Sequence, residues 1–421
     1  MLMSKKHPLK SALACASVMA TVFSGGSVNA ASTVDPLVAA VGPVSDVPVA
    51  VQNTRWAMLQ PYFNTLTFRS MDSLFTTRKV PHSGTPSPLT RTDKSLSFSY
   101  QFDGKSYTPE QFLDRTYTNA LLIMKDGNIV YENYRNNSDA QTRFMGWSMT
   151  KSLTSILIGC ALEEGRIQSL DDDITTYLPE LKQGAYNGVT IRQVLGMRSG
   201  VDYEERYDFE NPGLAARNHI LALVNNVARF VEPAKTIKRA HKPGEVFAYK
   251  TIDTAVLGLL IERVSDGGTI ASYMTRHLWE PLGAESDGFF IMDGQPGVGR
   301  EFNGAGYNAT MRDYARIGKM MLQEGRINGK QIVSPEWVRL STQSVGPEDR
   351  DGGPGGYGYQ WWTVADSDAY SAIGLQGQFI FVDPASNTVI VKLSYFPPGD
   401  DTQLTNETFS FFAAAAAWKA E

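Results

Sequence analysis

The sequence predicts an α+β fold in which a central antiparallel sheet is built from both chain ends and flanked by helices. Apolar runs at residues 120–124 and 129–134 flank the turn sequence Lys-Asp-Gly-Asn, a pattern typical of a β-hairpin. Near the other end of the chain, further strand patterns occur at residues 369–373, 377–382 and 388–396. Helical patterns are mixed with loops between these two groups of strands. A mainly helical lobe is therefore expected as an insertion at about residues 166–350.

The segment before the first hairpin, residues 31–110, is predicted to be an N-terminal extension that wraps the core. Only residues 95–102 alternate like a strand within it. Its regular structure is interrupted by prolines, among them Pro43, Pro48, Pro81, Pro86 and Pro88. The main domain is expected to span residues 111–421 and to end in a helix that contains the alanine run at 413–417.

The stretch with the most chemical content is Ser148-Met149-Thr150-Lys151, at the start of an apolar helical pattern that Gly165 ends. A serine and a lysine three residues apart lie on one face of a helix. A lysine whose charged form is destabilised can accept the serine proton, which is the Ser-Lys form of acyl-transfer chemistry. Ser148 is therefore a candidate nucleophile and Lys151 its candidate general base. The structural alternative is that Ser148 caps the helix and Lys151 is solvated.

A second candidate is Tyr249, which follows a Pro-Gly loop and precedes another apolar helical pattern. Thr251 is predicted to be the N-cap of that helix, so Tyr249 should lie just outside its N-terminus. A phenol near a lysine and a helix dipole can hold or pass a proton. The alternative is a tyrosine packed in the core with its hydroxyl satisfied.

A third candidate is the glycine-containing strand pattern at residues 374–384. A glycine in a strand lets another group approach the backbone, and a strand edge that faces a nucleophile can donate an amide to an oxyanion. We therefore predict that the amides of Ser148 and Gln378 form the oxyanion hole. The alternative is that Gly377 marks a bulge without catalytic meaning.

Composition and motifs argue against several other classes of protein. The chain has 39 Lys and Arg against 44 Asp and Glu, and no basic tract, so nucleic acid is not an expected partner. It has no H-E-x-x-H sequence and no Cys/His cluster, so we expect neither a metal site nor another cofactor. A Ser-His-Asp hydrolase is disfavoured because the stretch around Ser148 lacks the second glycine of a nucleophile elbow.

The first 30 residues look like a secretory signal peptide. Its positively charged start contains Lys5, Lys6 and Lys10. Small residues before position 31 predict cleavage near Ala30. The apolar stretch at residues 11–23 is too short for a span, which disfavours the alternative of a membrane anchor. The mature chain is thus expected to lack an integral membrane span and to be secreted or periplasmic.

In their order, the three candidate elements resemble those of the serine β-lactamase and penicillin-binding-protein superfamily. That family has an S-x-x-K helix, then a Tyr-x-Asn loop, then a Lys/His-Thr-Gly strand. The likeness covers about residues 110–421 and is greatest to the class C-like hydrolase branch, which includes esterases and 6-aminohexanoate-dimer hydrolase. Further stretches that carry it lie at 189–200, 279–283, 304–316 and 356–362. It implies a β-lactamase-like fold and an acyl-enzyme on Ser148, with Tyr249 passing the proton to the leaving group.

Departures from the family pattern concern the substrate. Thr251 stands where the family usually has Asn, and Leu375 stands where the third element has a basic residue. That basic residue helps to hold the carboxylate of a β-lactam or peptide, which leucine cannot do. The resemblance implies that the substrate-binding residues are Tyr207, Thr251, Gln376 and Gly377. For Tyr207 the alternative is a place on a surface loop.

The sequence therefore predicts an exported serine hydrolase that cleaves amide or ester bonds of small molecules. One alternative is a β-lactamase or DD-peptidase that acts on β-lactams or cell-wall peptides. A second alternative is a non-catalytic relative that binds ligands of the cell envelope.

Overall fold

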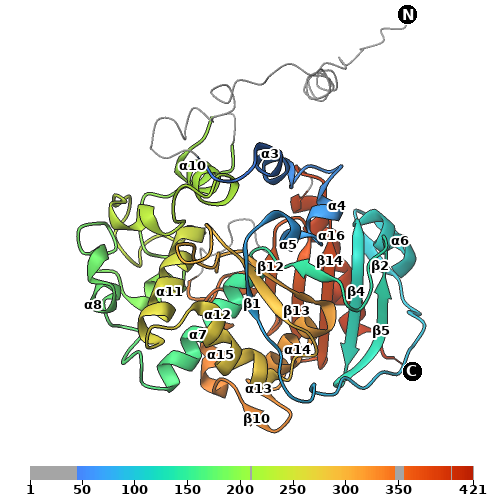
Figure 1. Ribbon diagram of the computed structural model, residues 1–421. Helices are drawn as coiled ribbons and strands as arrows, with labels where there is room; N and C mark the ends of the chain where they lie inside the picture. Colours follow the sequence, from blue (N-terminus) through green and yellow to red (C-terminus); the bar gives the residue numbers. More distant parts are fainter. Residues whose placement is uncertain (1–44, 209–210, 347–354, 400, 421) are drawn as a thin grey trace, which may run out of the picture. The chain divides into compact units, whose positions relative to one another are not determined.

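Strands that precede and follow the inserted lobe in sequence meet in one antiparallel sheet, as the strand patterns predict (Figure 1). The computed structural model describes residues 45–208, 211–346, 355–399 and 401–420, so the predicted signal peptide and its cleavage position at Ala30 lie outside the described residues. The sheet has six strands in the order β11-β12-β13-β14-β4-β5. In chain order these are β4 Thr118–Lys125, β5 Asn128–Tyr134, β11 Trp362–Thr363, β12 Tyr370–Gly374, β13 Gln378–Asp383 and β14 Thr388–Ser394.

Alternating side chains of this sheet pack into two separate hydrophobic cores. Leu122 and Val391 point to the larger core, which contains α7 (Met149–Glu163) and α14 (Met311–Leu322). Leu121 and Phe379 point to the smaller core, which contains the C-terminal helix α16 (Asp401–Ala417). Successive residues of a strand face opposite sides, so helices cover both faces of the sheet and the α+β prediction is confirmed.

A second, smaller sheet that the sequence did not predict combines strands of the inserted lobe with strands from earlier in the chain. This antiparallel sheet has the order β1-β7-β8-β6, with β1 Thr77–Val80, β6 Arg143–Met145, β7 Gly288–Ile291 and β8 Tyr307–Thr310. Every residue of β7 and β8 is buried, and each strand has only four residues, which is too short for a sequence pattern to distinguish it from a loop. Besides α14, the helices of the lobe are α8 Ile174–Tyr177, α9 Ile191–Leu195, α10 Leu214–His219, α11 Thr251–Val264, α12 Ile270–Met274, α13 Glu280–Leu282 and α15 Pro335–Ser341. Its short 3₁₀ helices are η2 Pro179–Leu181 and η4 Glu232–Lys235, and its short π-helices are η3 Ile220–Val224 and η5 Thr275–Trp279. The strands β9 Arg326–Ile327 and β10 Lys330–Gln331 form a separate antiparallel pair.

The described part of the N-terminal extension runs along several elements of the main domain. Its elements are α3 Val49–Ala57, α4 Asn64–Thr67, α5 Met71–Leu74, β1, and the hairpin of β2 Tyr100–Phe102 with β3 Lys105–Tyr107, followed by α6 Pro109–Arg115. The strand predicted at residues 95–102 is present only at Tyr100–Phe102. Leu96 and Phe98 still pack against the smaller core, so the alternation reflects burial of an extended segment without a ladder of hydrogen bonds.

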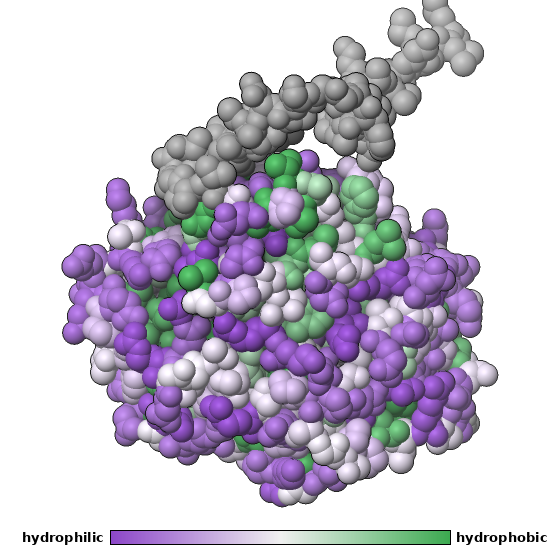
Figure 2. All heavy atoms as spheres, viewed as in Figure 1, coloured by the Kyte–Doolittle hydropathy of each residue, from purple (hydrophilic) through white to green (hydrophobic). Residues whose placement is uncertain are grey.

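On the face of the molecule in Figure 2, the surface formed by the N-terminal extension is the most apolar part. Hydrophobic residues gather toward the upper edge of that view, where α3 and α4 lie in Figure 1. The exposed apolar side chains of these helices and their connection are Val49, Trp56, Tyr62 and Leu66. None of the helices in the described part of the chain has the length and apolar character needed to cross a bilayer.

Candidate active site

Ser148 lies at the sharp turn between β6 and α7. Trp147 has a φ of 46°, which is rare for a residue with a side chain and indicates stored backbone strain. The turn is held by neighbours on both sides: the Gly146 amide donates to the Tyr307 carbonyl at 2.9 Å, and a Cβ at Gly146 would lie 2.7 Å from the Tyr314 hydroxyl. Ser148 occupies the N-cap position of α7, as the structural alternative has it, but its side chain makes no capping hydrogen bond and is available for another role.

Lys151 is buried one turn along α7, and its amine contacts the Ser148 hydroxyl. The distances from Lys151 Nζ are 3.0 Å to Ser148 Oγ, 3.1 Å to Thr251 Oγ1 and 2.8 Å to the Gly304 carbonyl oxygen. Burial lowers the pKa of Lys151 to about 8, and the charge of Glu205 opposes this shift. The alternative of a solvated first-turn lysine is therefore wrong, because only 1% of Lys151 is exposed.

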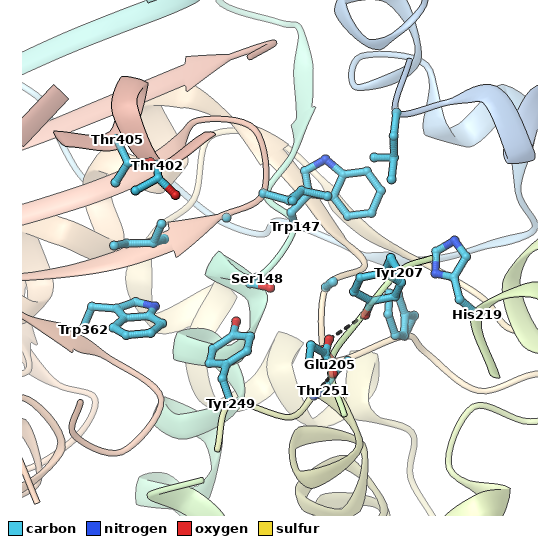
Figure 3. Close-up of a pocket in the computed structure, with 16 residues that line it drawn as sticks. Trp147, Ser148, Glu205, Tyr207, His219, Tyr249, Thr251, Trp362, Thr402 and Thr405 are labelled. Carbon is cyan, nitrogen blue, oxygen red and sulfur yellow. Dashed lines mark hydrogen bonds between the residues drawn. The ribbon is translucent and has the colours of Figure 1, made fainter. Parts of the chain in front are cut away.

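Tyr249 faces the same space from the loop before α11. The amine of Lys151 lies 4.8 Å from the centre of the Tyr249 ring, and Figure 3 shows the Tyr249 and Ser148 hydroxyls directed toward each other. Trp362 stacks on the ring with centroids 5.5 Å apart. Burial raises the pKa of Tyr249 and a hydrogen bond with Ser148 opposes that shift, so the phenol is neutral and able to give a proton.

Thr251 is not the N-cap of α11, which corrects the sequence prediction. Lys250 occupies the cap position, and Thr251 is the first helical residue. The Thr251 amide donates to Glu205 Oε2 at 2.9 Å, and its hydroxyl donates to Glu205 Oε1. The Glu205 carboxylate, from a distant segment, thus accepts a backbone amide that has no partner within the helix. The Thr251 oxygen does not have to cap the helix and can contact Lys151.

Glu205 is a residue of the site that the sequence analysis missed. Besides Thr251, it accepts a hydrogen bond of 2.6 Å from the hydroxyl of Tyr207 (Figure 3). Tyr207 lines the pocket as predicted, and its ring meets that of His219 edge-on at 5.7 Å. Burial lowers the pKa of His219 to about 4, so this imidazole is neutral. The only signal in the sequence was the clustering of acidic and tyrosine residues at 202–208.

The groups described above open into one pocket of about 330 Å³, a size suited to a small molecule. Most of its wall is apolar or aromatic, and among the described residues Glu205 is the only carboxylate in it. No arginine or lysine of the described ranges belongs to the lining. Besides residues already named, the pocket is lined by Leu59, Phe302, Ala305, Ile373, Gly374, Leu375, Thr402 and Thr405. Within the described ranges, no group of three or more His, Cys, Asp or Glu side chains is placed to hold a metal ion.

The third predicted element reaches the pocket through different residues from those expected. Gln376, Gly377 and Gln378 are absent from the pocket lining, whereas Gly374 and Leu375, at the end of β12, belong to it. The side-chain amide of Gln378 is buried and donates to the Ser394 carbonyl at 2.9 Å. Strand β13 is also an interior strand of the sheet and not an edge.

The backbone explains this difference. A Cβ on Gly374 would lie 2.2 Å from the Gly146 carbonyl oxygen. Gly374 is therefore the glycine that lets β12 approach the turn at residues 146–148, called the nucleophile turn below. Gly377, at a φ of 91°, belongs to the turn of the β12–β13 hairpin. Within the described part of the chain, the backbone amides of Ser148 and Leu375 donate to no protein acceptor. Two amides at the pocket wall are thus free to bind an oxygen.

Comparison with known proteins gives consistent results. The sequence model of the Beta-lactamase family matches residues 110–414. The chain is 33% identical over 304 residues to 6-aminohexanoate-dimer hydrolase from Paenarthrobacter ureafaciens, which covers 69% of this chain and 76% of that protein.

Two solved structures show the same fold. A candidate 6-aminohexanoate-dimer hydrolase from Bacillus anthracis has a TM-score of 0.73 at 24% identity, covering 85% of this chain and 95% of that one. The hydrolase EstCE1, described as having promiscuous acyltransferase activity, has a TM-score of 0.56 at 20% identity, covering 71% of this chain and 96% of that one.

Proposed function

Because this chain belongs to the β-lactamase family and is a hydrolase related to 6-aminohexanoate-dimer hydrolase, we propose that it is a serine hydrolase that cleaves amide or ester bonds of small molecules. The observation that carries the proposal is the buried amine of Lys151 at 3.0 Å from Ser148 Oγ. An amine with a pKa of about 8 is partly uncharged near neutral pH and can act there as a base.

The hydrogen bonds around this amine direct its lone pair at Ser148. A neutral amine has two N–H donors and one lone pair. The Gly304 carbonyl can only accept a hydrogen bond, and the Thr251 hydroxyl must also accept because its own proton goes to Glu205. Both N–H donors are then used, so the lone pair is left to face the Ser148 hydroxyl. Glu205 acts here as a positioning residue through Thr251.

In the proposed reaction, Ser148 Oγ forms a bond to the substrate carbonyl carbon while its proton passes to Lys151 Nζ. The C–N or C–O bond then breaks, and the Tyr249 hydroxyl gives its proton to the leaving amine or alkoxide and regains one from Lys151. In the second half of the reaction, the oxygen of water forms a bond to the acyl carbon while one water proton passes to the Lys151–Tyr249 pair. The bond between that carbon and Ser148 Oγ then breaks, the pair returns the proton to Ser148 Oγ, and the carboxylic acid is released.

The oxyanion formed in both halves is proposed to bind the amides of Ser148 and Leu375. These amides lie in the pocket wall and are free of protein acceptors, and each such donor contributes about 3 kcal/mol to the transition state. The Ser148 amide is also close to the N-terminus of α7, where the helix dipole favours negative charge. Leu375 therefore replaces Gln378 in our proposal.

A panel of substrates tests the proposed function. We expect the protein to turn over p-nitrophenyl esters and to hydrolyse nitrocefin poorly, because no arginine or lysine in the described part of the chain lines the pocket to hold the β-lactam carboxylate. A linear 6-aminohexanoate dimer in the same panel measures amide cleavage, with Ser148→Ala as the blank. Fast nitrocefin hydrolysis would favour the β-lactamase alternative, and loss of all turnover with ligand binding retained would favour a non-catalytic relative.

Glu205→Gln is expected to shift the pH dependence of turnover. The charge of Glu205 raises the pKa of Lys151, so removing it lowers that pKa and moves the rise of kcat/KM to lower pH. The plateau of kcat/KM should also fall, since glutamine has one accepting oxygen where Glu205 has two and cannot accept from both the amide and the hydroxyl of Thr251 as the carboxylate does. Glu204→Gln is the matched control, because that carboxylate is 71% exposed and pairs with Arg206. A rise at unchanged or higher pH in Glu205→Gln would contradict this role.

We also propose that the protein acts outside the cytoplasm after cleavage near Ala30. The support for this location is the leader-like composition of residues 1–30, and N-terminal sequencing of the purified native protein tests it.

A further inference from the structure

The N-terminal extension reaches the proposed catalytic site although it precedes the family match, which begins at residue 110. Leu59 contributes to the pocket wall. Helix α4 begins a few residues later, at Asn64. Asn64 and Phe68, the residue that follows the helix, contact the two backbone segments that carry the free amides. One contact is at the β12–β13 hairpin and the other is at the nucleophile turn.

At the hairpin, the side chains of Asn64 and Gln376 form a buried hydrogen-bonded pair, called the Asn64–Gln376 pair below. Asn64 Nδ2 donates to Gln376 Oε1 at 3.1 Å and to the Phe396 carbonyl at 3.0 Å. Gln376 Nε2 in turn donates to the Leu59 carbonyl at 2.9 Å. Asn64 is 0% exposed and Gln376 is 3% exposed, so these hydrogen bonds are shielded from water and their loss leaves buried groups unpaired.

The Asn64–Gln376 pair holds Gln376 in place, directly after Leu375, whose amide is the proposed oxyanion donor. Gln376 has a φ of 55°, a strained value for a residue with a side chain, which persists only where the surroundings hold it. Leu375 precedes Gln376 directly, and its N–H belongs to the peptide between Gly374 and Leu375, at the start of the same hairpin turn. Holding Gln376 in place therefore fixes the path of the turn and, through it, the position of this N–H. An oxyanion donor displaced by about 1 Å loses much of its effect.

At the nucleophile turn, Phe68 supports the other amide. Its carbonyl accepts the Met145 amide at 2.8 Å, and its ring meets Trp147 edge-on at 5.3 Å. Trp147 is the strained residue directly before Ser148. The same short stretch of the extension thus contacts the chain within a few residues of both free amides.

We propose that the extension is a positioning element of the catalytic site, in which Asn64, Gln376 and Phe68 fix the Leu375 amide relative to the Ser148 amide. None of the three lines the pocket, so they act through the backbone and not on the substrate. The proposal rests on the proposed function, since it concerns the oxyanion hole of that reaction. It also assigns a catalytic consequence to a segment outside the matched family region.

The test compares Asn64→Ala with Thr65→Ala in the same helix, whose hydroxyl instead donates to Asn119 at 3.1 Å. Asn64→Ala should lower kcat for a p-nitrophenyl ester by about 10- to 100-fold with KM changed by less than about threefold. The affinity for phenylboronic acid, which forms a tetrahedral adduct on a serine, should fall in parallel with kcat. Thr65→Ala should keep both values.

Gln376→Asn provides a second variant, since asparagine tolerates the left-handed backbone but is too short to reach the Leu59 carbonyl. Rates are divided by the concentration of sites that react with a fluorophosphonate, which removes any contribution of unfolded protein. Wild-type kcat and boronate affinity in both variants would overturn the inference while the proposed function stands. A wild-type protein that neither turns over esters nor reacts with the fluorophosphonate would overturn both.

Discussion

Ser148→Ala is expected to lower kcat for a p-nitrophenyl ester by about 10⁴-fold or more. The substitution removes the atom that forms the acyl bond, whereas the apolar pocket and the two free amides stay in place and bind substrate as before. KM should therefore change little, and the residual rate should show no burst. Initial rates and the thermal unfolding midpoint, measured on the same preparations, check this expectation.

Ser152→Ala is the matched control for that experiment. Ser152 lies one turn along α7, is buried, and donates to the Gln360 carbonyl at 2.6 Å, away from the pocket lining. Its loss removes a serine hydroxyl from the same helix without touching the proposed chemistry, so near-normal kcat is expected. If Ser148→Ala kept turnover within tenfold of wild type, another group would have to be the nucleophile.

The second large effect concerns the protonation of Lys151. Only the uncharged amine can accept the Ser148 proton, and its fraction grows as pH rises through the pKa of about 8. We therefore expect kcat/KM to be low at acidic pH, to rise through about pH 8, and to reach a plateau above it. Lys151→Arg should lose about 10³-fold or more and show no such rise, because a guanidinium stays protonated.

Lys250→Met distinguishes this titration from that of the other buried lysine close to the site. Burial also lowers the pKa of Lys250, and the charge of Asp253 is the strongest influence that opposes this shift. It donates no side-chain hydrogen bond to Ser148 or Tyr249 among the described residues, so its removal should leave the rise near pH 8 in place. Loss of the rise in Lys250→Met, or its persistence in Lys151→Arg, would refute the assignment of the base.

The parts of the site that could be predicted are those set by local sequence. The apolar periodicity after Ser148 fixed the helix, and a helix necessarily places Lys151 on the same side one turn later. The loop before α11 likewise carries Tyr249 to the helix terminus, where the structure brings it to Ser148. Five of the six strands of the sheet also followed from local patterns, because each has five or more residues, whereas β11 has two and was not predicted.

The errors arose where long-range contacts decide the outcome. Thr251 resembles an N-cap locally, but Glu205 from another segment takes that role. In the third element two glycines three residues apart compete, and only the packing of Gly374 against the Gly146 carbonyl shows which one meets the nucleophile. The reach of Asn64 to Gln376 spans more than 300 positions of the chain and has no local signature.

The most direct test of the account is to find where an acylating or phosphonylating reagent attaches. Intact mass spectrometry after treatment with a fluorophosphonate should show one added group per chain, and peptide mapping should place it on Ser148. Ser148→Ala should acquire none, and Lys151→Arg should react much more slowly than wild type. An unmodified wild-type protein, or a group mapped to any other residue, would contradict the claim that Ser148 is activated by the buried amine of Lys151.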